Sequence, residues 1–197
     1  MSADTLATAD TLRGKPSVPM VGLLLVEIIL GYEWLMSGLV KIARGDFASG
    51  LGAAVLEKLP QTAGWYGRFL QSAVVPNATA FGYAIEIAEF LAGAVLIVGP
   101  LIGLFTWHRV SDRLRRAVLF FTVVAAIGAA FLAINLHLFN AASHPWLMPE
   151  GSFDEGVDLD SVLPAIQLVI ASISIILFRR LGRERRGSPH AGLETSR

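Results

Sequence analysis

The sequence predicts an all-α protein: an integral membrane four-helix bundle, with short amphipathic helices between the first and second spans. The composition is the first observation, since 54% of the 197 residues are hydrophobic and only 16% are charged. Soluble domains usually carry about 25% charged residues. The second observation is the distribution, because the apolar residues gather into four long blocks separated by polar connections. Such blocks are typical of helices that have lipid as their solvent.

Four segments have close to the roughly 20 apolar residues that a helix needs to cross a bilayer. We expect spans at about residues 18–42, 81–107, 117–139 and 159–178. The third is the cleanest, because no charged residue interrupts it. The fourth contains Pro164 in its first turns, where a missing amide proton disturbs a helix least. The spans form one membrane domain, residues 18–182.

The charges on the connections predict an orientation. Basic clusters follow the second and fourth spans: Arg109, Arg113, Arg115, Arg116, then Arg179, Arg180, Arg183, Arg185 and Arg186. The loop at 140–158 is acidic instead. Because basic residues favour the cytoplasmic side, we expect a cell (inner) membrane protein whose tails, 1–17 and 183–197, are both cytoplasmic. Three basic residues in the first loop oppose this orientation, and the two arginine clusters outweigh them.

The first loop, residues 43–79, has a pattern of its own. Apolar residues recur at helical spacing on both sides of Pro60. This pattern predicts two short amphipathic helices that lie in the outer interface and cap the bundle. Trp65 and Tyr66 suit the depth of the lipid headgroups.

Several polar side chains fall inside the predicted spans, where an ionisable group costs about 2.5–3.5 kcal/mol on insertion scales. At a rise of about 1.5 Å per residue, six of them lie in the outer half of the bundle and are candidates for a buried polar pocket. They are Glu33, Lys41, Glu86, Glu89, Asn135 and His137. We expect Lys41 to reach Glu86 or Glu33. Glu27 is the exception, because it lies nearer the inner side.

Small residues share faces with these charges. Gly31, Trp34 and Gly38 recur with Glu27 and Lys41 at spacings of three, four and seven, and Gly93 shares a face with Glu86 and Glu89. Faces of this kind allow two membrane helices to approach closely. We therefore expect Gly31, Trp34, Gly38 and Gly93 to serve helix packing.

The composition limits the chemistry. The chain has no cysteine, which excludes disulfides, thiolate metal sites and a cysteine nucleophile, so a redox role would need a borrowed electron carrier. Its formal net charge of zero favours no nucleic-acid partner. The buried charges have two interpretations: they pair and orient the helices, or they line a pocket that handles protons or a quinone headgroup. His137 as a haem or metal ligand is less favoured, and we expect no metal site.

The residues resemble a known family. Residues 31–41, GYEWLMSGLVK, resemble the first-helix pattern of the DoxX superfamily, in which a glycine precedes a lysine by three. Three further stretches resemble its DoxD branch, which includes the small membrane subunit of thiosulfate:quinone oxidoreductase. They are 65–70 (WYGRFL), 75–77 (VPN) and 85–99 (IEIAEFLAGAVLIVG). The resemblance covers about residues 20–140, and the acidic loop at 140–158 departs from it.

The resemblance implies a four-helix membrane fold linked to quinone-coupled oxidation of sulfur compounds. By motif position, Gly38, Lys41, Glu89 and Gly93 carry over. The sequence therefore suggests a quinone-interacting subunit or accessory of a membrane redox complex, with no covalently bound cofactor and no assigned catalytic residue. Its partners would be the lipid bilayer and a redox subunit. A non-enzymatic scaffold that anchors a partner protein is the alternative. A small-solute transporter is less favoured, because no inverted repeat is visible.

Overall fold

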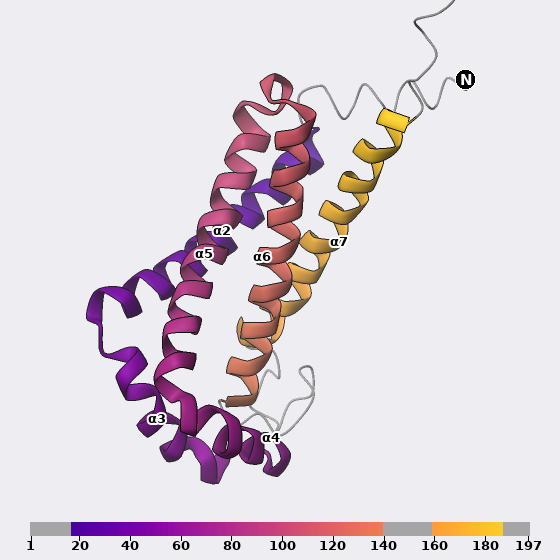
Figure 1. Ribbon diagram of the computed structural model, residues 1–197. Helices are drawn as coiled ribbons and strands as arrows, with labels where there is room; N and C mark the ends of the chain where they lie inside the picture. The colour runs from indigo at the N-terminus through magenta and orange to yellow at the C-terminus, as the bar shows by residue number, and fades with distance from the viewer. Residues whose placement is uncertain (1–16, 140–158, 187–197) are drawn as a thin grey trace, which may run out of the picture.

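The protein is a bundle of four long helices. The computed structural model describes residues 17–139 and 159–186, and the long helices in these ranges are α2 (Val18–Arg44), α5 (Ala78–Phe105), α6 (Asp112–Phe139) and α7 (Leu159–Arg186) (Figure 1). Within these described ranges, four stretches are long and apolar enough to cross a membrane: Val18–Arg44, Gly64–Phe105, Asp112–Phe139 and Val162–Arg183. The predicted all-α architecture, with four helices long and apolar enough to span a membrane, is confirmed. The last two helices are longer than predicted, since α6 begins at Asp112 and α7 continues through its arginines.

The first helix has clear start and stop signals. Pro19 lies in its first turn, where its fixed φ suits a helix and its missing N–H is not needed. Gly45 ends α2 with a φ of 71°, in the left-handed region that glycine enters without strain. The N–H of Gly45 donates to the carbonyl of Lys41 at 3.0 Å. The chain therefore turns sharply after Arg44 and enters the next helix at once.

Residues 47–77, which we call the cap, cover one end of the bundle. The cap contains α3 (Phe47–Lys58), η1 (Leu59–Gln61), α4 (Gly64–Phe69), η2 (Leu70–Val74) and η3 (Val75–Asn77), and it runs directly into α5. The short helices predicted between the first two spans are thus present. Their buried side chains Leu51, Val55, Tyr66, Leu70 and Val74 form one apolar cluster, against which Leu138 and Phe139 of α6 pack. We call this the capped end, and the opposite end, where α5 turns into α6, the open end (Figure 1).

The bundle is built from two helix pairs, α2 with α5 and α6 with α7, which meet mainly where α5 contacts α6. Glycines bring the first pair very close. A Cβ on Gly93 would lie 2.2 Å from the backbone nitrogen of Leu35, and one on Gly38 would lie 2.4 Å from that of Phe90. Gly31 faces the backbone of Leu96 in the same way, at 2.8 Å. These distances leave no room for a side chain, so the α2–α5 contact depends on glycine.

The second pair packs through alanines, and its outer surface is apolar. Ala126, Ala129 and Ala133 are fully or almost fully buried in the central cluster, which also contains Ile170 of α7. On the outward side of α6, five large apolar side chains are about half exposed or more: Phe120, Phe121, Val124, Ile127 and Phe131. A water-soluble domain rarely exposes so continuous an apolar stripe. This surface fits a lipid environment.

Candidate functional site

In the part of the chain that the structure describes, one polar site lies toward each end of the bundle. The site toward the capped end joins α2 to α5 through Lys41, Ser37 and Glu89. The Lys41 Nζ lies 2.6 Å from Oε1 and 2.5 Å from Oε2 of Glu89. It also donates to Ser37 Oγ at 2.9 Å, and Ser37 Oγ donates to Glu89 Oε2 at 3.0 Å. The sequence placed Lys41 near Glu86 or Glu33, and the structure pairs it with Glu89 one turn further along α5.

The environment of this triad is nearly closed. The side chain of Glu89 is fully buried and that of Lys41 is 21% exposed. The ring of Phe47, the first residue of α3, lies 5.0 Å from the ammonium group and covers it from the cap side. A buried charge is tolerated when its partner and its hydrogen bonds are complete. Both carboxylate oxygens of Glu89 have partners here, so this arrangement holds α2 against α5.

The other candidate pocket residues do not join the triad as a group. Glu86 is 4% exposed, and its Oε1 has no hydrogen-bond partner among the described residues. Asn135 accepts a hydrogen bond from the Tyr66 hydroxyl at 3.2 Å and donates to the carbonyl of Phe131 at 2.8 Å. Asn135 therefore ties α6 to the cap. His137 is buried near the end of α6, and Glu33 is half-buried on α2.

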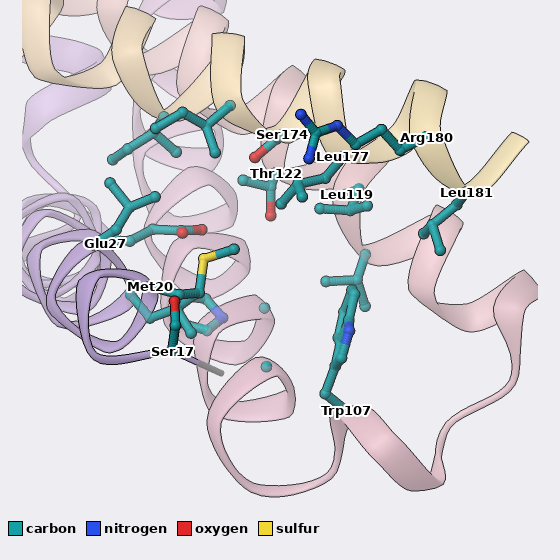
Figure 2. Close-up of a pocket in the computed structure, with 18 residues that line it drawn as sticks. Ser17, Met20, Glu27, Trp107, Leu119, Thr122, Ser174, Leu177, Arg180 and Leu181 are labelled. Atoms are coloured by element: carbon teal, nitrogen blue, oxygen red, sulfur yellow. The ribbon is translucent and has the colours of Figure 1, made fainter. Parts of the chain in front are cut away.

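The second site is a cavity of about 250 Å³ at the open end, where all four long helices contribute side chains. Its walls are mostly apolar, including Met20, Leu23, Leu119 and Leu177. Three helices supply its main polar groups: Glu27 from α2, Thr122 from α6, and Ser174 and Arg180 from α7. Figure 2 shows the Glu27 carboxyl and the Arg180 side chain directed toward the same space. A concave apolar site with a few polar groups is the usual form of a small-molecule pocket.

Glu27 is the most unusual residue of this cavity. It is only 4% exposed, yet its Oε1 has no hydrogen-bond partner among the described residues. The side chain of Thr122 forms a hydrogen bond with the same carboxyl group. Gly99 leaves the space beside them open, since a Cβ there would lie 3.1 Å from Thr122 Oγ1 and 3.9 Å from Glu27 Oε1. One carboxyl oxygen is therefore left available inside an apolar cavity.

Arg115 holds one lining residue of the cavity, Trp107, in place. Its guanidinium donates to the carbonyl of Trp107 through Nε at 3.0 Å and Nη2 at 2.8 Å, and it pairs with Asp112 at 3.1 Å. The same guanidinium lies 5.6 Å from the centre of the Trp107 ring. Trp107 lines the cavity (Figure 2), so Arg115 positions a cavity wall without lining it. This explains why a buried arginine is present in the first turn of α6.

The sequence pattern missed most of this cavity. Glu27 stood out as a charge within a span, but it lay apart from the polar groups of the outer half. Thr122 and Ser174 are small polar residues that membrane helices contain routinely, and only the packing of four helices brings them to Glu27. The depth of Glu27, Thr122 and Ser174 within the predicted spans was the one sequence feature that could have indicated this cavity.

In the described ranges, no group of three or more histidine, aspartate or glutamate side chains is placed to hold a metal ion.

Comparison of the chain with protein-family models, with curated protein sequences and with solved structures finds no match.

Proposed function

We propose that this chain is a DoxX-type multi-pass protein of the cell membrane that binds a quinone headgroup in the open-end cavity. It would act as a subunit or accessory of a redox complex, with the open end toward the cytoplasm. One observation carries the proposal: Glu27 is a buried carboxyl with an unpartnered oxygen in a mostly apolar cavity. A quinone ring is flat and apolar, and it bears carbonyl oxygens that accept hydrogen bonds. The cavity offers both kinds of contact.

The polar groups of the cavity suit the proton uptake and the hydrogen bonding that quinone reduction requires. Conversion of a quinone to a quinol takes up two electrons and two protons. The carboxyl of Glu27 would donate one proton to a ring oxygen, and water at the open end would supply the second proton and reprotonate Glu27. The hydroxyl of Ser174 would hydrogen-bond another part of the headgroup. The electrons would come from a partner redox subunit that oxidises a sulfur compound, as the resemblance to the DoxD branch implies. The chain contributes binding and proton exchange in this scheme, because it has no cysteine with which to carry electrons.

The triad at the capped end, Lys41, Ser37 and Glu89, would have a structural role. Lys41 and Glu89 satisfy each other, and Ser37 completes their hydrogen bonds. Groups so fully engaged have no free donor to offer a quinone without first breaking the ion pair. We therefore assign the triad to holding the α2–α5 pair, and the ligand to the open end.

The proposal is tested by quinone titration of the purified protein in detergent, with decylubiquinone as the probe and tryptophan fluorescence as the readout. Trp107 lines the cavity, so a bound quinone should quench its emission. We expect saturable quenching that Trp107→Phe removes in large part. Trp65→Phe, which alters an exposed tryptophan of the cap, should leave the quenching curve unchanged.

A second pair of variants tests the carboxyl itself. Glu27→Leu removes the hydrogen-bonding group at similar size and should weaken quinone binding roughly three- to tenfold, the effect of one buried hydrogen bond. Glu57→Gln, at an exposed glutamate of α3, is the matched control and should bind as the parent protein does. Equal quinone affinity in Glu27→Leu and the parent protein would contradict the proposal.

A further inference from the structure

A second hollow lies on the outside of the bundle, between α6 and α7 near the open end. Its volume is about 350 Å³, and three kinds of residue line it: Arg113 and Arg116, Ala117, and Phe120, Phe121 and Phe178. We propose that this hollow binds one anionic phospholipid, with the two arginines on the headgroup phosphate and the phenylalanines along the acyl chains. The proposal is independent of the quinone cavity, with which it shares no lining residue.

The order of the residues along α6 matches the order of groups in a phospholipid. Arg113 and Arg116 lie in the first turns, and Phe120 and Phe121 follow four to eight residues later. At about 1.5 Å per residue, the rings lie roughly 6–12 Å further into the span than the guanidinium groups. A phospholipid has the same sequence of groups, with its charge at the membrane surface and its hydrocarbon directly below.

The two arginines are placed to bind an anion. They are one helical turn apart, so they share one face of α6. Arg116 lies over the ring of Phe178, with 4.8 Å between its Cζ and the ring centre, which orients the guanidinium across the α6–α7 groove. Asp112, the nearest acid on α6, is paired with Arg115 at 3.1 Å. Guanidinium groups bind phosphate through two parallel hydrogen bonds, so the pair suits the phosphate of an anionic lipid headgroup.

The apolar part of the hollow requires a lipid in place of a free phosphate. Phe120 is 53% and Phe121 55% exposed, and their rings contact each other edge to face at 5.5 Å. They form an apolar wall directly below the arginines. Inorganic phosphate would use the arginines alone, whereas a phospholipid would use both parts. Basic pockets between membrane helices at the membrane surface are known to recognise acidic lipid headgroups.

Native mass spectrometry of the delipidated protein in detergent tests the proposal. The probes are dioleoyl phosphatidylglycerol and dioleoyl phosphatidylcholine, which have the same acyl chains and differ in charge. We expect tight binding of one phosphatidylglycerol and at least tenfold weaker binding of phosphatidylcholine. Each arginine removed should weaken phosphatidylglycerol binding about fivefold, so Arg113→Gln/Arg116→Gln should lose about 25-fold. Phosphate or glycerol 3-phosphate at millimolar concentration should not displace the lipid.

The matched control is Arg44→Gln/Arg68→Gln, which removes the same charge from exposed arginines near the capped end and should bind the lipid as the parent does. Arg113→Gln alone keeps the Arg116–Phe178 contact and serves if the double variant does not fold. Equal phosphatidylglycerol binding by the arginine variants, equal binding of phosphatidylcholine, or displacement by free phosphate would each overturn the proposal. Quinone quenching of Trp107 should stay unchanged in Arg113→Gln/Arg116→Gln, so the two proposals fail separately.

Discussion

Both ends of the bundle bury a glutamate, but they surround it differently. At the capped end, Glu89 is fully buried, and both of its oxygens have partners in Lys41 and Ser37. At the open end, Glu27 is almost as deeply buried, but Oε1 has no partner among the described residues and faces a cavity. The packing differs as well, because glycines close the α2–α5 contact near Glu89, whereas Gly99 lines an open space beside Glu27.

Structural and functional charges in a membrane bundle differ in how completely their hydrogen bonds and ion pairs are satisfied. A charge whose partner and hydrogen bonds are complete contributes to the fold, and its loss should lower stability. A buried carboxyl that is only partly satisfied and lies beside a cavity raises the free energy of the empty protein, and a ligand or a proton can lower it. The expected changes in stability therefore have opposite signs at the two ends.

The largest effect should come from the glycine contact beside the triad. Gly93→Val would place a side chain within 2.5 Å of the backbone of Leu35, so α2 must leave α5. We expect a loss of at least about 3 kcal/mol, or no folded protein. Gly128→Val is the control, because a Cβ there meets nothing within 4 Å. Thermal melts in detergent measure the stability of both variants. Similar melting temperatures for the two would show that α2 and α5 do not approach as closely as the structure indicates.

The ion pair should have the next largest effect. Lys41→Met leaves Glu89 buried without its cation, and removal of one partner of a buried pair typically costs about 3–5 kcal/mol. Lys41→Met/Glu89→Met removes both charges and should recover most of that loss. The full double-mutant cycle, measured by unfolding in detergent, checks this. Additive losses from the two single variants would mean that the contact contributes little.

Glu27→Leu should change stability in the opposite direction. It replaces a partly satisfied buried carboxyl with an apolar side chain of similar size, so we expect a gain of about 1–2 kcal/mol. The same melts that test Lys41→Met provide the measurement. A stability loss as large as that of Lys41→Met would show that Glu27, like Glu89, stabilises the fold. The two ends of the bundle would then not differ in this respect.

The smallest effect should come from the cap. Tyr66→Phe removes the hydroxyl that donates to Asn135 at 3.2 Å, and one hydrogen bond of this kind contributes about 0.5–1.5 kcal/mol. Tyr83→Phe alters an exposed tyrosine of α5 and should be neutral. Hydrogen exchange in residues 64–77 should rise in Tyr66→Phe. Unchanged exchange there would show that the apolar cluster alone holds the cap.

The sequence predicted the fold well because hydropathy and helix length are local properties. The four spans and the helices between the first two follow from composition and spacing alone. The site was harder to predict. Helical spacing placed Lys41 beside α5 but not opposite Glu89, because a one-turn shift between two helices depends on how their glycines interlock. The cavity around Glu27 requires side chains from all four helices, including Ser174 on the last, and no local pattern connects residues so far apart.

The pairing of α2 with α5 also bears on the order in which the chain enters a membrane. Lys41 and Glu89 are 48 positions apart, and both belong to the first half of the chain. Neither charge is stable in lipid alone, but each neutralises the other once α5 has been synthesised. Because domains form from the N-terminus during synthesis, the first helix pair can close before α6 leaves the ribosome. The second pair would then insert against a partner in which Lys41 and Glu89 already neutralise each other.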